Sequence, residues 1–382
     1  MDLFQNLKTF LKKSHRPLVV ILGPTASGKT ALSLKAAKEL NGEIISADSR
    51  QIYKGMEIGT DMILPDKQEG IPHHLLAITT PNKVVSLAEY KEMAIETIKK
   101  IHQRKKLPIL VGGTGLYISA ITENYEVPRI KPNLSLRRKL QEEAKKKGVE
   151  FVHQRLTKLD PAAAKKIHPN NLRYVIRAIE INMASGKTKN DKKSQSKFDV
   201  YMMGINWPRE NLYERINRRV DEQFLKGLVE EVKALLKKGY REDLPAMTSL
   251  GVKEIIPHVK NKNRMTMQMA AETLKRNIRH YAKRQLTWFK KYKNVNWLTP
   301  KEFMELVKPA KPVKVVEVKK VTAKKVAKKE VKKPVKKPAK KVVQKKKAKP
   351  VKKVVKKLVK KPVKKAKKPT KKSTKKKSSK KR

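Results

Sequence analysis

Residues 18–30 read LVVILGPTASGKT, an unbroken apolar run followed by a glycine-containing loop. The run of residues 18–22 is rich in β-branched side chains, which is typical of a buried parallel strand. Residues 30–40 continue with a helical pattern, and Asn41 and Gly42 suit the end of that helix. The order of strand, loop and helix predicts a phosphate-binding P-loop in a parallel α/β sheet.

The loop matches the pattern G-x4-G-K-[ST] at every defining position. Backbone N–H groups and the helix N-terminus bind phosphate oxygens in such loops. Lys29 is expected to bridge phosphates, and the Thr30 hydroxyl is expected to ligate Mg²⁺. The residues predicted to bind pyrophosphate or nucleotide are Gly23, Pro24, Thr25, Ala26, Ser27, Gly28, Lys29 and Thr30.

A second predicted strand, residues 42–48, places Asp48 at its carboxyl end, where open α/β sheets bind their ligands. Asp48 has three interpretations: a Mg²⁺ ligand of the Walker-B type, a general base, or a residue that caps a turn. The polar residues Ser49, Arg50 and Gln51 that follow favour the base, because they suit contact with a substrate.

A third strand ends in Gly112 and Gly113, followed by Thr114. Adjacent glycines allow the close approach of another molecule, and they equally suit a tight turn from strand to helix. Thr114 offers a hydroxyl at this edge of the sheet.

Two basic helices are predicted in the second half of the chain. Residues 212–240 carry apolar side chains at every fourth position and crowd Arg215, Arg218 and Arg219 into one segment, so one arginine is expected to reach an anionic leaving group. Residues 272–298 interleave cations with aromatic rings, a combination that suits single-stranded RNA. Trp288 and Phe289 lie in this segment, and at least one of them is expected to anchor the core.

Composition divides the chain unevenly. Residues 309–382 contain 36 Lys and Arg against two acids, a net charge of +34 out of the total of +61, which predicts a disordered tail that attracts nucleic acid without reading sequence. There is no cysteine, the N-terminal residues do not resemble a signal peptide, and the apolar runs are too short to cross a bilayer. We therefore expect a cytoplasmic protein without membrane contact, acting as a monomer.

The predicted fold class is α/β, a P-loop NTPase-like parallel sheet with an inserted helical domain. Residues 1–123 form the first part of the core, and residues 199–308 form the rest with the basic helices. Residues 124–198 are predicted to form the helical insertion, with breaks at residues 147–148 and 160–161, and to grip the substrate.

Seven motifs, spread in order over residues 16–298, resemble the tRNA dimethylallyltransferases, also called tRNA isopentenyltransferases. The matching stretches are GPTASGKT, SADSRQIYKGMEIGTD, PHHLL, GGTGLYI, HPNNLRYVIRAIE, RINRRVDEQF with GLVEEV, and AKRQLTWF. The resemblance implies Mg²⁺-assisted transfer of a dimethylallyl group from dimethylallyl pyrophosphate to N6 of the adenosine at position 37, just 3′ of the anticodon of a tRNA.

Residue roles carried over from the resemblance begin with the reaction. Asp48 would accept the N6 proton, Thr114 would lie beside that base and Mg²⁺, and Arg219 would bind the departing pyrophosphate. The insertion and the basic C-terminal helix would hold the tRNA anticodon stem-loop. The tRNA contacts so implied are Asp48, Ser49, Arg50, Gln51, Arg173, Arg177, Ser249, Gly251, Lys253, Lys283, Arg284, Gln285, Thr287 and Trp288.

Two other functions remain alternatives. A prenyltransferase acting on free adenylates shares the first motifs but ordinarily lacks the helical insertion and the basic C-terminal helix. A P-loop kinase or RNA-dependent NTPase would require a recognisable Walker-B strand, and none is found in the sequence.

Overall fold

The computed structural model describes residues 3–128, 130, 132–186 and 194–307. The predicted disordered tail, residues 309–382, lies outside the described residues. Within the described ranges, no helix is long and apolar enough to span a membrane.

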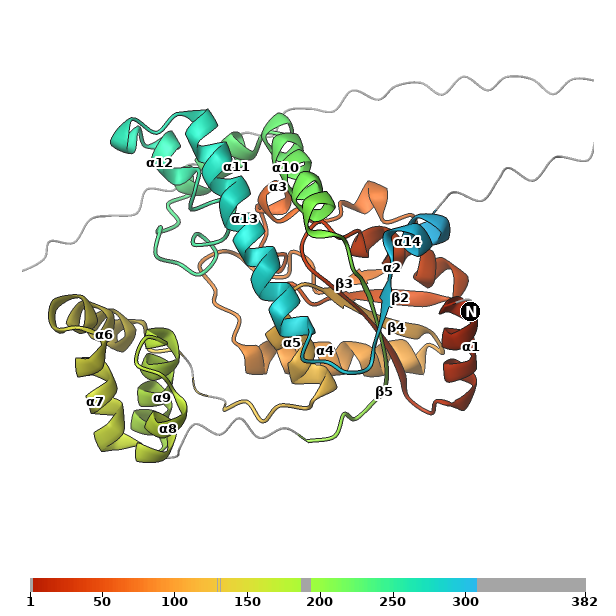
Figure 1. The fold of residues 1–382 in the computed structure, drawn as a ribbon, viewed down its shortest axis with the longest axis horizontal. Helices are drawn as coiled ribbons and strands as arrows, with labels where there is room; N and C mark the ends of the chain where they lie inside the picture. The colour runs from red at the N-terminus through yellow and green to blue at the C-terminus, as the bar shows by residue number, and fades with distance from the viewer. Residues whose placement is uncertain (1–2, 129, 131, 187–193, 308–382) are drawn as a thin grey trace, which may run out of the picture. The chain divides into compact units, whose positions relative to one another are not determined.

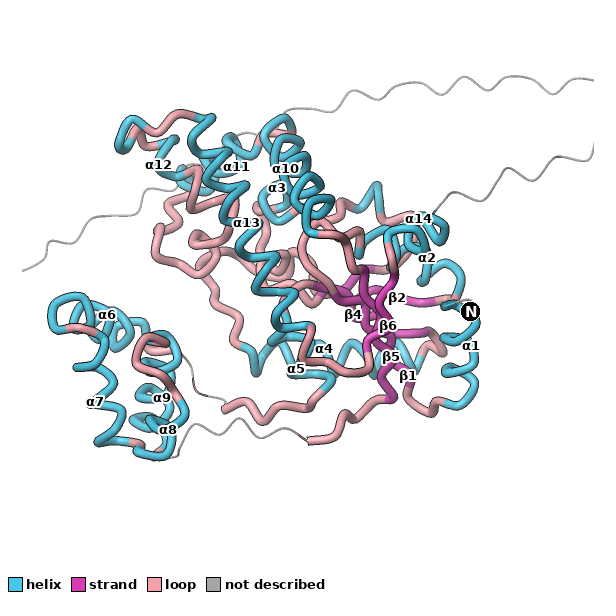
Figure 2. Tube along the Cα trace, viewed as in Figure 1, coloured by secondary structure: helices cyan, strands magenta, loops and turns pink. Residues whose placement is uncertain are grey.

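A six-stranded parallel sheet forms the centre of the fold, in the order β3-β2-β4-β1-β5-β6 (Figure 2). β1 lies between β4 and β5, with Val19 opposite both Ile109 and Tyr201. The strands are β1 (Pro17–Leu22), β2 (Gly42–Ser46), β3 (His73–His74), β4 (Leu107–Gly112), β5 (Asp199–Ile205) and β6 (Val295–Leu298). The predicted α/β class with a parallel sheet is confirmed.

Helices cover both faces of this sheet (Figure 1). Alternate residues of β1 point to opposite faces, so Val19 and Ile21 pack in one core cluster and Leu18 and Val20 in another. The first cluster contains residues of α1 (Leu3–Lys13), α2 (Lys29–Glu39) and α14 (Pro300–Val307), and the second contains residues of α4 (Leu87–Gln103) and α5 (Gly115–Thr122). Phe289 is fully buried in the second cluster, as one of the two aromatic residues was expected to be.

The end of α2 agrees with the prediction at Asn41 and differs from it at Gly42. Leu40 caps the helix and Asn41 takes the left-handed backbone (φ 50°), whereas Gly42 is the first residue of β2. A Cβ at position 42 would lie 2.7 Å from Ile109 Cδ1, so this glycine allows two strands to pack closely rather than ending a helix.

The helical insertion has a hydrophobic core of its own, with Leu140, Val152, Leu156 and Ile179 fully buried. It consists of α6 (Leu134–Lys147), α7 (Val149–Leu159), α8 (Pro161–Lys166) and α9 (Leu172–Ser185). Both predicted breaks occur. Gly148 has φ 88°, and the Asp160 carboxylate accepts a hydrogen bond from Ala163 N at 2.9 Å to start α8.

Two predicted helices are shorter than expected. The segment 212–240 forms two helices, α10 (Arg209–Leu225) and α11 (Leu228–Lys237), because Gly227 takes φ 94° and turns the chain even though the apolar repeat continues. The basic helix α13 (Met267–Phe289) ends before residues 295–298, which form β6.

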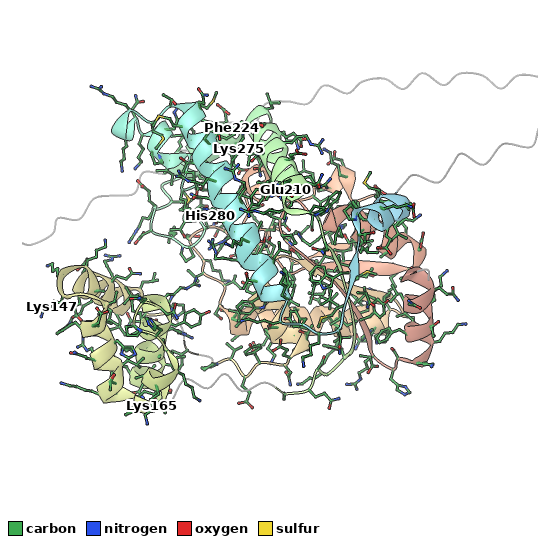
Figure 3. The ribbon with its side chains drawn as sticks, viewed as in Figure 1. Lys147, Lys165, Glu210, Phe224, Lys275 and His280 are labelled. Atoms are coloured by element: carbon green, nitrogen blue, oxygen red, sulfur yellow. The ribbon has the colours of Figure 1, made fainter. Side chains whose placement is uncertain are left out.

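A third core cluster joins α10 to α13, through Ile216 and Val220 on one helix and Leu274 and Ile278 on the other. The short segments α3 (Glu57–Thr60), η1 (Pro65–Lys67), α12 (Ile256–Val259) and η2 (Lys262–Arg264) complete the described elements. Lys275 of α13 also forms an ion pair with Asp221 of α10 at 2.8 Å. Figure 3 labels Lys275 and His280 along α13.

Candidate active site

The P-loop connects β1 to α2 and is held in an unusual backbone conformation. Gly28 has φ 99° and Ala26 has φ 61°, both in the left-handed region. Lys29 Nζ donates to the carbonyl oxygen of Pro24 at 2.7 Å, so the lysine folds back over the loop. Ser27 Oγ is buried and has no hydrogen-bond partner among the described residues. The loop thus presents a cation and a buried hydroxyl at the carboxyl end of β1.

The Lys29 ammonium lies in a strongly perturbed environment. Its pKa is lowered to about 8, first by burial and then by the positive charge of Arg219. The carboxylates of Asp48 and Asp61 partly oppose this shift. The four charged groups therefore interact electrostatically, although they come from four separate segments of the chain.

Arg215 of α10 and Trp207, which precedes that helix, both support the P-loop. Arg215 Nε donates to Ala26 O at 2.8 Å, and its guanidinium lies 4.4 Å from the Trp207 ring. Trp207 Nε1 donates to Ser27 O at 2.8 Å. These contacts use loop carbonyls rather than loop N–H groups, two of which, Thr25 N and Ser27 N, donate to Gln285 Oε1 and Pro24 O.

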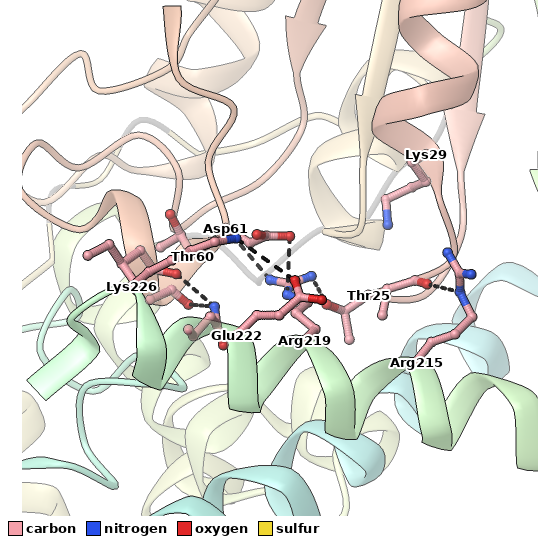
Figure 4. A network of polar contacts seen from close by, with 12 residues as sticks. Thr25, Lys29, Thr60, Asp61, Arg215, Arg219, Glu222 and Lys226 are labelled. Carbon is pink, nitrogen blue, oxygen red and sulfur yellow. Dashed lines mark hydrogen bonds and ion pairs between the residues drawn. The ribbon is translucent and has the colours of Figure 1, made fainter. Parts of the chain in front are cut away.

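Arg219, one turn after Arg215, contacts the loop from the same helix face (Figure 4). Its Nη1 donates to Thr25 Oγ1 at 2.7 Å and its Nη2 donates to Thr60 O at 3.4 Å. Its Nε lies 3.2 Å from Asp61 Oδ2. Arg218 points away, with 73% of its side chain exposed. Of the three arginines in the predicted cluster, the structure places two at the P-loop.

Asp48 and Thr114 lie just beyond the carboxyl ends of β2 and β4. Asp48 Oδ1 accepts a hydrogen bond from Arg50 N at 2.8 Å, so the capping interaction that the sequence suggested does form. Thr114 Oγ1 accepts from Ser49 N at 3.0 Å. Both side chains therefore stabilise the same turn, at residues 48–50. The Asp48 carboxylate also raises the pKa of Lys29.

Tyr281 is a site residue that the sequence analysis missed. Burial raises the pKa of its phenol to about 12, the nearby Asp48 carboxylate adds to this rise, and a contact with the Thr114 hydroxyl opposes it. Tyr281 was visible only as one aromatic residue among several on a basic helix. Its place beside Asp48 depends on the packing of α13 against the sheet.

The glycines at and just after the end of β4 leave space for other groups of the protein itself. A Cβ on Gly112 would lie 2.2 Å from Ala47 O, and one on Gly113 would lie 2.3 Å from Gln285 Nε2. A Cβ on Gly115 would lie 2.4 Å from Trp288 Cδ1. Only Gly113 and Thr114 separate β4 from α5, which agrees with the tight-turn interpretation, and the turn carries Thr114.

Gln285, predicted to contact tRNA, is 5% exposed and is bonded inside the protein. Its Oε1 accepts from Thr25 N at 2.9 Å, and its Nε2 donates to Gly113 O at 2.8 Å. One amide thus connects the P-loop with the turn of Thr114. The helical spacing offered a signal, because Gln285 lies four residues before the buried Phe289 and seven after the buried Ile278.

The other predicted tRNA contacts of the C-terminal half lie in different environments. Lys283, Arg284 and Thr287 are exposed on α13, as is the labelled His280 (Figure 3), and Trp288 is partly buried over Gly115. Ser249 is 2% exposed and Gly251 is buried with φ 90°, against Gly59. Lys253 is exposed, with Nζ 3.6 Å from Glu254.

The remaining predicted contacts divide between the site and the insertion. Arg50 donates to Pro245 O, and Gln51 Nε2 donates to Thr60 O at 3.2 Å, so both also stabilise local structure. On α9, Arg173 is exposed, whereas Arg177 forms an ion pair with the buried Glu180.

Two sequence comparisons agree with one another. The sequence model described as IPP transferase matches residues 51–292. A tRNA dimethylallyltransferase of Acetivibrio thermocellus is 46% identical over 75% of this chain and 92% of its own length. One from Halothermothrix orenii is 49% identical over 73% of this chain and 86% of its own length.

Solved structures give the same result. A tRNA isopentenylpyrophosphate transferase from Bacillus halodurans is 42% identical, with a TM-score of 0.57 over 76% of this chain and 94% of the other. A eukaryotic dimethylallyltransferase acting on tRNA is 28% identical, with a TM-score of 0.63 over 74% of each chain.

Proposed function

We propose that this chain, which belongs to the IPP transferase family, transfers a dimethylallyl group from dimethylallyl pyrophosphate to N6 of an adenosine in tRNA and releases pyrophosphate. The adenosine is the one at position 37, 3′ of the anticodon. One arrangement carries the proposal: a P-loop with Arg219 beside it interacts electrostatically with a carboxylate, Asp48, just beyond the end of β2, which β4 separates from β1 in the sheet. The site therefore combines a base with a group of pyrophosphate-binding residues, the P-loop (residues 23–30) and Arg219, which we call the cradle.

The cradle binds the donor through its pyrophosphate. The P-loop N–H groups, Lys29 and Arg219 supply positive charge, and the buried Ser27 hydroxyl supplies a further polar group. Arg219 uses three of its five N–H groups in contacts with the chain and has two left for a ligand. In the reaction, these groups stabilise the charge that develops on the leaving pyrophosphate.

The transfer step forms one bond and breaks another. N6 of adenosine attacks C1 of the dimethylallyl group, the C1–O bond breaks, and its electron pair leaves with pyrophosphate. Asp48 accepts the N6 proton; Oδ1 already accepts the Arg50 N–H, which fixes the orientation of the carboxylate. Thr114 and Tyr281 line the same position and orient the amine.

The Mg²⁺ ion fits the donor set on the P-loop side. Thr30 is exposed in the first turn of α2, and the described residues contain no group of three acidic or histidine side chains that would form a protein cage. A single hydroxyl ligand suits Mg²⁺, which commonly completes its shell with phosphate oxygens and water. When bound by Thr30 and the donor, the ion would neutralise charge on the pyrophosphate.

We assign the binding of RNA phosphates to the exposed cations around this site. Lys283 and Arg284 are exposed on α13, and the neighbouring Gln285 holds both the P-loop and the turn of Thr114. RNA phosphates bound on the exposed face are thereby connected through one helix to the site of reaction. We assign Gln285 a positioning role rather than a direct RNA contact. The target adenosine must leave its stack to reach Asp48.

Labelled dimethylallyl pyrophosphate, supplied with unmodified tRNA, with AMP or with no acceptor, tests the proposal. Label is expected in tRNA only, at N6 of the adenosine 3′ of the anticodon. Equal labelling of AMP would favour the adenylate prenyltransferase. A parallel reaction with ATP tests the NTPase: RNA-stimulated ATP hydrolysis without prenyl transfer would contradict the proposal.

A further inference from the structure

Asp61 is an acidic residue placed directly against the proposed leaving-group site. It follows α3 and caps that helix with left-handed backbone, φ 51°. Its Oδ2 lies 3.2 Å from Arg219 Nε, while 46% of its side chain remains exposed. The proposed transfer reaction assigns it no role, and its charge is opposite to those of Lys29 and Arg219.

The contact between Asp61 and Arg219 is one of charge rather than of hydrogen-bond geometry. Arg219 Nε has no hydrogen-bond partner among the described residues, although the carboxylate oxygen is close. The hydrogen bonds of the guanidinium go to two uncharged oxygens, Thr25 Oγ1 and Thr60 O. Those oxygens therefore set the orientation of Arg219, and Asp61 contributes its negative charge.

That charge acts on Lys29 as well as on Arg219. Asp61 raises the pKa of Lys29, against the larger lowering effects of burial and Arg219. Figure 4 shows Asp61, Arg219, Thr25 and Lys29 in one neighbourhood. Pyrophosphate bound to Lys29 and Arg219 would then lie within a few ångströms of a carboxylate, and like charges at that range repel.

We propose that Asp61 is a positioning residue that acts through Arg219: its carboxylate competes with pyrophosphate for the guanidinium and so speeds release of the leaving group after transfer. The inference rests on the proposed function, because it needs the P-loop to hold pyrophosphate. Asp61 remains beside Arg219 when the product departs, so its charge partly offsets that of the guanidinium between turnovers.

Asp61→Asn tests the role of the charge, because asparagine has the same shape and tolerates left-handed backbone. Asp61→Gly removes the carboxylate entirely and also accepts φ 51°. Asp66→Asn is the matched control, an exposed residue in the same connection. Both Asp61 variants should bind inorganic pyrophosphate with Mg²⁺ about tenfold more tightly than the wild type, measured by calorimetry, with no change in the control.

Pre-steady-state kinetics provide the second readout. The Asp61 variants should show a burst of prenylated tRNA followed by a slower steady rate, because release becomes limiting. Unchanged or weaker pyrophosphate binding in either variant would overturn the inference. If the wild type itself binds no pyrophosphate, the proposed function fails first, so the two failures can be distinguished.

Discussion

Arginine is used differently in the P-loop region and in the helical insertion. Arg219 bonds to Thr25 Oγ1 and Thr60 O, has one partly exposed carboxylate nearby, and keeps N–H groups for a ligand. In the insertion, Arg137 and Arg177 both bind Glu180, which is 2% exposed. The first arrangement presents positive charge to a ligand, and the second neutralises it within a core.

This difference shows why residue type alone does not identify a binding arginine. Arg137 Nε and Nη2 donate to the two oxygens of Glu180 at 3.0 and 2.7 Å, and Asn133 N donates to the same carboxylate at 2.6 Å. A buried carboxylate that accepts hydrogen bonds from several donors holds together the segments that carry them, so we call Glu180 a structural centre of the insertion. Arg177 therefore has a stabilising role in the insertion, whatever further contact it makes with RNA.

Replacement of Asp48 is expected to have the largest effect, at the P-loop side of the comparison. Asp48→Ala should lower kcat by about 10³-fold, since the N6 proton loses its acceptor. Binding of pyrophosphate with Mg²⁺, measured by calorimetry, should survive. Loss of pyrophosphate binding would instead identify Asp48 as a metal ligand of the Walker-B type.

The sequence was sufficient for the P-loop because its parts are contiguous, from residue 18 to residue 40. Asp48 and Thr114 could also be placed, because parallel strands bring their carboxyl ends to one edge of the sheet. Gln285 could not, because its bond to Thr25 joins residues 260 positions apart. Likewise, the bond between Arg137 and Glu180 depends on how α6 packs against α9.

Local signals account for the errors in the helices. Gly227 lies within a continuous apolar repeat, and the repeat favoured one helix although glycine in left-handed backbone separates two. Gly42 was interpreted by its proximity to a helix end, whereas the contact with Ile109 requires a glycine there. In both cases a glycine had a conformational or packing reason that periodicity does not show.

Arg219 and Arg218 provide a matched pair on one helix. Arg219→Gln should lower kcat/KM for dimethylallyl pyrophosphate by about 10²-fold, as expected for loss of one charged donor to the leaving group. Arg218→Gln removes the same charge from a side chain that is 73% exposed and should have little effect. Equal losses in the two variants, in single-turnover rates, would mean that overall charge rather than the cradle is responsible.

Glu180→Gln tests the insertion side of the comparison. It leaves two arginines without their carboxylate and should destabilise the insertion by about 3 kcal/mol. The three tryptophans, Trp207, Trp288 and Trp297, lie outside the insertion, so their fluorescence serves as the control. Hydrogen exchange should accelerate in residues 134–185, with the tryptophan signal unchanged. Unaltered exchange there would contradict the assignment of Glu180 as a structural centre.

The pH dependence of the same carboxylate has a definite sign. Burial alone would raise the pKa of Glu180, but its hydrogen bonds with Arg137 and Arg177 lower it below the ordinary value of a glutamate. The stabilisation is therefore present above the unfolded pKa, near 4.3, and is lost as the pH falls through the lowered value. In the Glu180→Gln variant, the helical insertion should lack this acid-dependent loss of protection from hydrogen exchange.

Lys29 gives the smallest effect, because it depends on pH rather than on removal of a group. Burial and Arg219 lower its pKa to about 8, so the free enzyme loses this cation as the pH rises through that value. The kcat/KM for the prenyl donor should then fall by up to about tenfold per pH unit above 8, since this parameter reports groups of the free enzyme. Lys29→Arg keeps its charge throughout this range and should flatten the alkaline limb. If the alkaline limb persists unchanged in Lys29→Arg, another group titrates there. Deprotonation of Lys29 would then not explain the fall in kcat/KM.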